Sequence, residues 1–526
     1  MFRQVFFIVS ALALLLITGL GIIWPQSWWV MIVILPVILL GLIDVYQKKQ
    51  TILRIYPIVG RLRYLFESIR PEIQQYFVES DTNGQPVNRE FRSLVYQRAK
   101  GVRDTRPFGT LFDVYRPGSE WINQSLSPTP VSEVPRVQVG GPQCTQPYDA
   151  SYLNISAMSF GALSKHAILA LNQGAKLGGF AHNTGEGGLS PYHQQPDGDL
   201  IWQIGTGYFG CRSNDGRFNP EAFAEKAGQQ QVKMIEIKLS QGAKPGHGGI
   251  LPAAKLTAEI AAIRGVPMGQ DVISPSAHSA FSSPIGLLEF VGQLRDLSSG
   301  KPVGFKLCVG IKSEFLAICK AMLQTGIYPD FITVDGSEGG TGAAPIELTN
   351  SVGMPMRDGL SFIHSSLQGI GIRQHIRLIA AGKVLSAFHI LRELALGADM
   401  VNSARAMMFA LGCIQSRSCN TNRCPTGVAT QDPARYQQLN INDKARRVAQ
   451  YHTATMRALM ELIASAGLHS PSDIRPQHIM RRVNGPNIQS YAELYPGIEC
   501  DCLKENGHVP EIWQKDWQHA DPEKWN

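Results

Sequence analysis

Two long apolar runs open the chain, and neither contains a charged side chain. They cover residues 5–23 and 28–43, and a short turn at residues 24–27 joins them. A helix needs about 20 apolar residues to cross a bilayer, and tryptophans, which flank this turn, favour the membrane interface. The pattern predicts a membrane hairpin of two transmembrane helices over residues 1–46.

Basic residues follow the second apolar run and predict which side of the membrane it faces. Residues 44–70 hold six lysines and arginines against two acidic residues. By the positive-inside rule this flank is cytoplasmic, so we expect a multi-pass protein of the inner (cytoplasmic) membrane whose catalytic domain faces the cytoplasm. A signal peptide is disfavoured because no small-residue cleavage site follows the first run. A hairpin buried in a soluble core is the other, less favoured interpretation.

From residue 151 short apolar runs alternate with amphipathic stretches such as residues 254–265 and 315–326. This alternation is typical of βα units that build a parallel sheet. It predicts an α/β fold, one (β/α)8 TIM barrel over residues 151–435. The strands expected in this barrel are residues 151–158, 233–240, 271–274, 302–310, 330–336, 376–382 and 399–404.

The segments on either side of the barrel have different patterns. Residues 47–150 start with helical periodicity, pass through a turn-rich loop at 80–86, and continue as an arm with little periodicity. We expect a linker there, and an arm that wraps the barrel. Residues 436–526 begin with a strongly helical stretch, which predicts a helical C-terminal extension and tail.

Composition narrows the function classes. The chain has 526 residues and a net charge of +7, which is modest for its size, and it contains no nucleic-acid-binding motif. Nine cysteines in so long a chain do not indicate a disulfide framework. No glycine fingerprint for a nicotinamide nucleotide is present, so electrons must come from a separate donor.

Two short loops after the last expected strands have the composition of a phosphate site. Gly382 and Lys383 follow one strand, and Ala404 and Arg405 follow the next. Glycine lets backbone N–H groups approach an anion, the cations add charge, and the corresponding loops of such barrels often hold phosphate. Either loop alone could be an ordinary turn; the pair in succession favours phosphate.

Three cysteines lie close together after these loops, with spacing C-x5-C-x4-C. A set of this kind in a reduced protein is typical of a metal or iron–sulfur site. Zinc would need a fourth ligand, and no histidine lies nearby in the sequence. Chance spacing is the alternative. The three cysteines are Cys413, Cys419 and Cys424.

Four segments resemble the FMN-binding synthase domain of glutamate synthases. They are SAMSFGALSKHAILALNQGAKLGG with HNTGEGG, KLSQGAKPGHGG, VDGSEGGTGAAP, and the stretch from Leu378 to Thr430. The resemblance extends over roughly residues 88–435 and is greatest to short, membrane-anchored members of that family. It implies an FMN-binding barrel and a [3Fe-4S] cluster held by the three cysteines.

The resemblance also implies roles for individual residues. A buried lysine on a central strand, Lys306, would lie against the flavin and needs an anionic partner, and Lys244 could bind a substrate carboxylate. The expected catalytic residues are Lys244, Glu186 and Lys306. The expected cofactor-binding residues are Ala157, Met158, Ser159, Lys238, Gln241, Lys306, Asp335, Gly339, Gly340, Gly382, Lys383, Ala404 and Arg405.

The implied function is an FMN- and iron–sulfur-dependent oxidoreductase that acts on C–N bonds by reductive amination of 2-oxoglutarate or a related 2-oxo acid. The electron donor would be a ferredoxin or a reductase subunit. Departures from the family pattern at Leu189, Ser190, His247, Ile250 and Asn420 keep a different imine or amine open. An amino-acid or N-alkyl amino-acid dehydrogenase is therefore the first alternative, and a non-catalytic membrane-anchored assembly module is the second.

Overall fold

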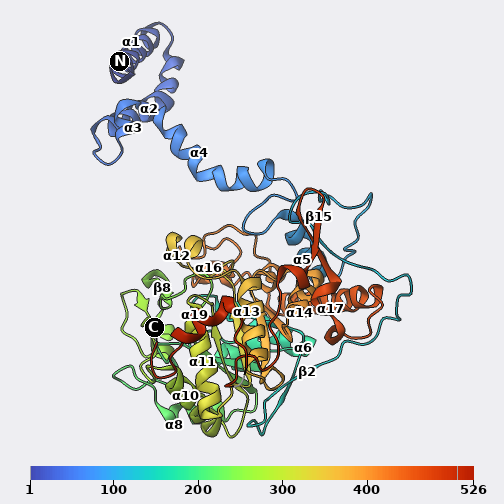
Figure 1. Ribbon diagram of the computed structural model, residues 1–526. Helices are drawn as coiled ribbons and strands as arrows, with labels where there is room; N and C mark the ends of the chain where they lie inside the picture. Colours follow the sequence, from blue (N-terminus) through green and yellow to red (C-terminus); the bar gives the residue numbers. More distant parts are fainter. Residues whose placement is uncertain (1, 506, 526) are drawn as a thin grey trace. The chain divides into compact units, whose positions relative to one another are not determined.

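The structure is a computed structural model that describes residues 2–505 and 507–525. The chain divides into two compact units, Met1–Pro86 and Val87–Asn526 (Figure 1). The division falls at the end of the turn-rich loop at residues 80–86.

The N-terminal unit is built on an apolar helical hairpin. Helix α1 (Phe2–Ile23) leads through the 3-10 turn η1 (Pro25–Val30) into helix α2 (Met31–Tyr46). Both α1 and the stretch Pro25–Tyr46 are long and apolar enough to cross a membrane. Most of their large apolar side chains are exposed, whereas a core hairpin would bury them. The soluble-core interpretation therefore does not fit this unit.

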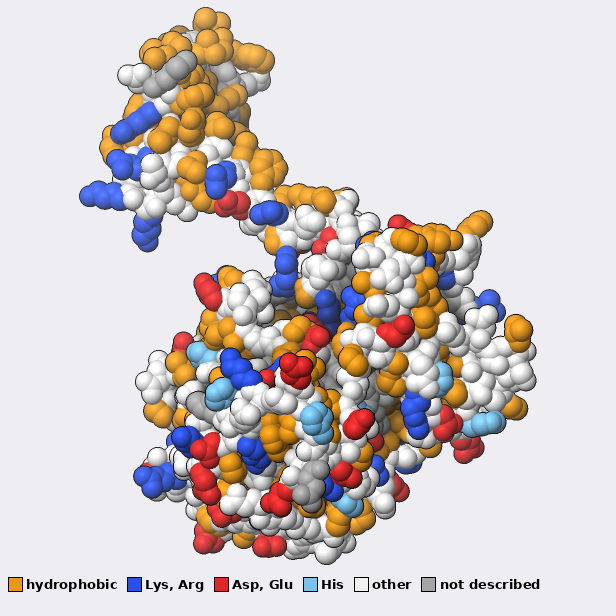
Figure 2. All heavy atoms as spheres, in the orientation of Figure 1, with side chains coloured by type: hydrophobic (Ala, Val, Ile, Leu, Met, Phe, Trp, Pro, Cys, Tyr) orange, Lys and Arg blue, Asp and Glu red, His pale blue; other side chains and the backbone are white. Residues whose placement is uncertain are grey.

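A buried ion pair fixes the exit from the hairpin. Asp44, near the end of α2, is fully buried and accepts hydrogen bonds from the guanidinium of Arg61 and from the backbone N–H of Ile58. The chain between them contains α3 (Thr51–Ile55), and Arg61 belongs to α4 (Gly60–Ile73), which a π-helical turn, η2 (Gln74–Val78), continues. Hydrophobic side chains cover most of this unit, and basic side chains gather towards one end of it (Figure 2).

The second unit contains a closed barrel of eight strands, which confirms the predicted fold class. The strand order is β10-β11-β12-β13-β4-β5-β6-β7, every neighbouring pair is parallel, and β13 closes on β4 through the register Val401↔Leu153. The strands are β4 (Leu153–Ile155), β5 (His182–Asn183), β6 (Leu200–Ile204), β7 (Val232–Lys238), β10 (Val303–Leu307), β11 (Phe331–Asp335), β12 (Arg377–Ala381) and β13 (Met400–Ser403).

Six of the seven expected strands belong to this barrel, and one does not. Residues 271–274 contain β9 (Val272–Ile273), which pairs antiparallel with β8 (Ile250–Leu251) outside the barrel. The prediction was wrong because a short apolar run reads the same in a hairpin as in a buried strand. Strands β5 and β6 were missed: β5 is only two residues long, and polar residues border β6.

Helices cover the outside of the barrel, and local sequence signals set their ends. Helix α6 (Lys165–Gly178) follows Ser164, whose side chain accepts a hydrogen bond from the N–H of Ala167, and Gly179 caps its C-terminus in the left-handed region. The others are α7 (Pro191–Gln194), α8 (Pro220–Ala227), α9 (Ala258–Arg264), α10 (Pro284–Leu297), α11 (Lys312–Thr325), α12 (Ile346–Ser351), α13 (Met356–Gly369), α14 (Ala387–Ala395) and α15 (Arg405–Leu411).

The arm before the barrel and the extension after it meet in one small sheet. Strand β1 (Glu120–Ile122) of the arm pairs with the hairpin β14 (Ile479–Asn484) and β15 (Asn487–Ser490) of the extension. The long helix α17 (Ile441–Ser465) packs against α6 and the arm helix α5 (Arg89–Lys100). Further elements here are β2 (Val137–Val139), β3 (Tyr148–Ala150), α16 (Pro433–Tyr436), α18 (Tyr491–Leu494) and α19 (Glu511–His519).

One carboxylate connects four strands inside the barrel. Glu236 of β7 accepts hydrogen bonds from Asn183 Nδ2 of β5 (2.8 Å), from Gln203 Nε2 of β6 (2.6 Å) and from Thr333 Oγ1 of β11 (2.6 Å). All four side chains are buried. A buried donor that loses its acceptor keeps the full cost of its desolvation. Glu236 is therefore a structural hub of the barrel.

We expect Glu236→Ala to lower the free energy of unfolding by about 3–6 kcal/mol, because three buried donors lose their acceptor. Denaturant unfolding of the purified protein measures this. The matched control is Glu225→Ala on α8, whose side chain is exposed and whose loss should change stability by less than about 0.5 kcal/mol. Equal effects of the two substitutions would contradict the role of Glu236.

Candidate functional site

The loops that follow the carboxyl ends of the barrel strands define what we call the barrel mouth. Glu186 follows β5, Lys238 ends β7, Asp335 ends β11, and Lys306 lies on β10 between the last two strands. Because the strands are parallel, these ends meet at one side of the barrel, which is where barrel enzymes place their active sites. The structure thus brings the expected catalytic residues to one mouth.

Four cationic side chains are buried at or beside this mouth. Lys238, Lys244, Lys306 and Arg264 are each at most 7% exposed. Buried cations are costly unless anions compensate them. Lys238 Nζ lies 2.8 Å from Glu186 Oε1, and Lys306 Nζ lies 3.0 Å from the carboxylate of Asp335. These pairs leave Lys244 and Arg264 without a carboxylate within ion-pair distance among the described residues.

The pKa values of this group follow its burial and its charges. Burial lowers the pKa of Lys244 to about 8, and Lys238 adds to that fall while Glu186 opposes it. Burial alone would raise the pKa of Glu186, but Lys238, Lys244 and Arg264 hold it below its ordinary value. Lys244 is therefore poised to lose or gain a proton near neutral pH, and Glu186 is ionised.

Lys306 has the anionic partners that its burial requires. Burial alone would lower its pKa, but Asp335, Glu236 and Glu186 raise it above the ordinary value. Lys306 is therefore a fixed positive charge on a central strand. Asp335 also accepts a hydrogen bond from the backbone N–H of Gly242 (3.2 Å), so it positions the loop that carries Lys244.

Sequence reasoning missed Arg264. It ends α9, in a segment between β7 and β10 that lies outside the barrel sheet, so no strand-end rule points to it. Its Nη2 donates to the carbonyl of Phe160 (3.3 Å), but its buried Nε has no partner in the structure. Burial lowers its pKa to about 10, and Glu186 opposes the fall. An arginine at the end of an amphipathic helix was the only signal, and it is a weak one.

A second cationic group lies where the phosphate loops were predicted. Lys383 follows β12 with φ +54°, a left-handed conformation that is uncommon for lysine and recurs at functional loops. Arg405 follows β13, and its Nη2 donates to the carbonyl of Glu338 (2.6 Å). Burial and Arg405 lower the pKa of Lys383, and burial lowers the pKa of Arg405. Both are cations in a partly buried place, which suits an anion.

Glycine backbones line the approach to these groups. A side chain on Gly340 would touch Arg405, and one on Gly339 would meet Asp335 and Ala243. Gly382 faces Met356, and Ala404 lies between β13 and α15. The remaining predicted positions also follow strand ends at the mouth: Ala157, Met158 and Ser159 follow β4, and Gln241 follows β7.

The three cysteines are free thiols in one neighbourhood. Burial raises the pKa of Cys413 to about 12, and Cys419 and Cys424 add to the rise. Lys255, which is 3% exposed and was not predicted, donates to the carbonyls of Cys419 (3.3 Å) and Ala162. Among residues 2–505 and 507–525, no three side chains of His, Cys, Asp or Glu gather as ligands of a single metal ion.

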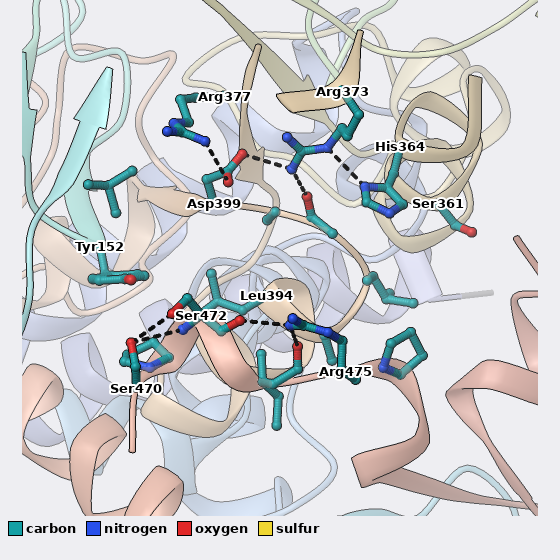
Figure 3. A pocket seen from close by; sticks show the side chains of 18 of the residues that line it. Tyr152, Ser361, His364, Arg373, Arg377, Leu394, Asp399, Ser470, Ser472 and Arg475 are labelled. Carbon is teal, nitrogen blue, oxygen red and sulfur yellow. Dashed lines mark hydrogen bonds and ion pairs between the residues drawn. The ribbon is translucent and has the colours of Figure 1, made fainter. Parts of the chain in front are cut away.

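A cavity of about 730 Å³ lies at the opposite end of the barrel (Figure 3). Its lining includes Arg377, the first residue of β12, and Asp399, the residue before β13. The guanidinium of Arg373 donates to His364, to Asp399 and to the carbonyls of Ile376 and Gly397. Arg373 thus joins the loops that line this cavity. The cavity is therefore a contact region between loops, and it lies apart from the expected site residues.

The departures from the family pattern have structural roles of their own. Ile250 lies on β8, where it pairs with Ile273 of β9, and the Nδ1 of His247 lies 2.9 Å from the carbonyl of Gly248. Ser190 caps α7 and interacts with His193. At these positions the loops that border Glu186 therefore carry an apolar side chain and polar side chains whose hydrogen bonds stay within their own loops.

Comparison with known proteins assigns the family. The conserved region in glutamate synthase matches residues 143–469 of this chain. A glutamate synthase large subunit-like protein of Bacillus subtilis, YerD, is 37% identical over 502 residues, which are 87% of this chain and 95% of that protein. The chain therefore belongs to the glutamate synthase family, a family of oxidoreductases that act on CH–NH2 donors, as its resemblance predicted.

Other relatives match a shorter part. The archaeal glutamate synthase (NADPH) of Methanocaldococcus jannaschii is 36% identical over 323 residues, 61% of this chain and 60% of that protein. The archaeal-type glutamate synthase (NADPH) of Thermotoga maritima is 33% identical over 345 residues, which are 65% of this chain and 64% of that protein. The chain thus spans less than two thirds of these enzymes.

A solved mandelate oxidase with (S)-2-phenylpropionate has a TM-score of 0.41 at 14% identity, and the match covers 76% of this chain and 98% of that one.

We expect Lys306→Met to lower the free energy of unfolding by about 3–5 kcal/mol, because it leaves Asp335 buried without its partner. The double variant Lys306→Met/Asp335→Leu should recover much of this loss. Denaturant unfolding of the unsubstituted protein, the two single variants and the double variant gives the coupling free energy between the two side chains. The control is Lys233→Met at the other end of β7, whose exposed pair with Asp199 (3.7 Å) should contribute less than about 1 kcal/mol. Equal losses in both variants would refute a buried pair at Lys306.

Proposed function

We propose that this protein is an FMN- and iron–sulfur-dependent oxidoreductase that reductively aminates 2-oxoglutarate or a related 2-oxo acid. The observation that carries the proposal is the excess of buried cations at the barrel mouth. Anions bound at the mouth would offset the cost of burying these cations, and both a flavin phosphate and a substrate carboxylate are anions. The barrel of residues 151–435 would hold the site, and residues 436–526 would support it.

The residues at the mouth suit FMN. Lys383 and Arg405 would hold the phosphate together with the backbone at Gly382 and Ala404, and the small residues after β4 would let the ring lie close to the backbone. Bound FMN would supply two-electron transfer to the substrate. Lys306, with its pKa raised by Asp335, would be a permanent cation available to the ring.

The second set of residues suits an oxo acid. Lys244 and Arg264 would bind its carboxylates, and Lys238 and Glu186 would order this group and orient the C–N centre. The overall reaction is 2-oxo acid, ammonium, two electrons and two protons to amino acid and water. Lys244 would exchange protons near neutral pH because its pKa is about 8.

Electrons would enter at a [3Fe-4S] cluster held by Cys413, Cys419 and Cys424. A cluster spreads its ligands over several irons, so its thiolates need not converge as ligands of one ion do. Three free thiols in one neighbourhood, with the Lys255 ammonium beside them, suit an anionic cluster. The donor would be a ferredoxin or a separate reductase subunit.

The N-terminal unit would anchor the enzyme in the inner (cytoplasmic) membrane. The hairpin α1–α2 has the length and hydropathy of two spans, and the basic residues after it would lie on the cytoplasmic side with the barrel. Residues 1–46 would be the anchor, and residues 47–150 the linker and arm.

An amino-acid or N-alkyl amino-acid dehydrogenase is the second candidate, and Ile250 favours it. An apolar residue beside the loop of Glu186 offers no hydrogen bond to a second substrate carboxylate. Such an enzyme would use the same flavin and cluster in the opposite direction.

One assay on the anaerobically purified, detergent-solubilised protein tests the proposal. The optical spectrum should show bound flavin, and reduced ferredoxin with 2-oxoglutarate and ammonium should give glutamate. Flavin reduction by an amino acid or N-alkyl amino acid, without glutamate synthesis, would support the dehydrogenase. Folded protein without flavin would overturn both.

Cysteine substitution separates the two cofactors. We expect Cys424→Ala to abolish the electron paramagnetic resonance signal of an oxidised three-iron cluster while the flavin absorbance remains, because the cluster loses one of three ligands. The matched control Cys319→Ala alters a fully buried cysteine of α11 and should retain both signals. Unchanged iron content in Cys424→Ala would exclude this cysteine as a ligand.

The binding of 2-oxoglutarate should weaken as pH rises through the pKa of Lys244. Well below pH 8 the ammonium is present and affinity is full; between pH 7 and pH 9 affinity should fall about ten-fold, since the protonated fraction does. Calorimetric titration of the flavin-loaded protein measures this. Lys244→Gln should bind weakly with a flat profile. A pH-independent affinity of the unsubstituted protein would rule out Lys244 as the receptor.

A further inference from the structure

Helix α4 presents an apolar stripe to solvent. In a helix, successive residues are rotated by about 100°, so the spacing of these residues places all of them within an arc of about 100°. Their side chains are 38–59% exposed, so the described residues leave much of their apolar surface uncovered. They are Leu62, Leu65, Phe66, Ile69 and Ile73.

The charges of α4 are arranged around this stripe. Arg63 and Arg70 project at one edge of it, Arg61 and Glu72 lie at the other edge, and Glu67, which pairs with Arg63, falls towards the opposite side. Arginine at the margins of an apolar face can hold its charge among lipid headgroups while its stem packs on the apolar surface. The pattern is that of a helix that lies flat in a membrane interface.

Contacts within the N-terminal unit place the start of α4 at the end of the hairpin. Arg61 Nη2 lies 2.6 Å from Asp44 Oδ1, and Asp44 is the third-last residue of α2. A side chain on Gly60 would meet Leu53 and Ile52, so α4 also begins against α3. The helix therefore starts at the level where the second span leaves the bilayer.

We propose that α4 is an interfacial helix whose apolar stripe is embedded in the cytoplasmic leaflet and whose exposed Arg70 binds anionic lipid headgroups. This inference rests on the membrane hairpin of the proposed function. A bilayer is favoured over a second copy of the chain as the occupant of the stripe, because α4 follows directly on the apolar span α2 and its start is fixed to the end of that span.

Photo-crosslinking of the full chain in nanodiscs with phosphatidylcholine and phosphatidylglycerol tests this. The photoreactive aromatic residue benzoylphenylalanine replaces Phe66 on the stripe or Tyr64 on the other face, so both changes are aromatic for aromatic. We expect lipid adducts, detected by mass spectrometry, to be several-fold more abundant at position 66. The yield at 66 should fall when phosphatidylglycerol is omitted.

A photoreactive residue in the hairpin distinguishes failure of the interfacial helix from failure of the membrane anchor. The same photoreactive residue at Leu15, which is 70% exposed on α1, must give lipid adducts if the hairpin spans the membrane. Adducts at 15 without adducts at 66 would overturn the interfacial helix alone. Chain-to-chain crosslinks at 66 would overturn it in favour of a second copy. Absence of adducts at 15 would overturn the membrane anchor.

Discussion

Burial of positive charge at one end of the barrel is the constraint on which the rest of the site depends. Four cations are nearly inaccessible there, and Glu186 and Asp335 face only two of them at ion-pair distance. Such an arrangement lowers the free energy of unfolding unless further anions lie beside the cations. Strands β7, β10 and β11 carry these charges on regular secondary structure, so the fold itself fixes where the positive charge lies.

The rigidity comes from backbone packed on backbone. A side chain at Gly242 would collide with the carbonyl of Gly336, so the loops after β7 and β11 meet without any intervening side chain. Asp335 bridges the same two loops through the N–H of Gly242. Below them, Glu236 ties four strands together. The position of Lys306 is thus determined from both sides.

How much of this could be predicted depended on where each residue lies relative to a strand. Barrel strands with long apolar runs and the glycine loops that follow them were predictable, because both signals are local. The two-residue strand β5 carries too little periodicity to detect. Arg264 and Lys255 reach their sites through a segment outside the barrel sheet, so only tertiary packing brings them there. The β14–β15 hairpin was missed although its signal is local, since Asn484 and Gly485 stand at its turn; only its pairing with the distant strand β1 depends on tertiary structure.

The same charges bear on which acid the site would take. In the proposed function Lys244 would attract a carboxylate as a point charge, and the planar guanidinium of Arg264 would orient it through parallel hydrogen bonds. Ile250, on β8, contributes apolar surface and no side-chain hydrogen bond. A site of that kind would select for one carboxylate and an apolar chain more than for a second carboxylate at one position. The site would thus favour the class of 2-oxo acids and leave the choice among them to the shape of the β8–β9 hairpin.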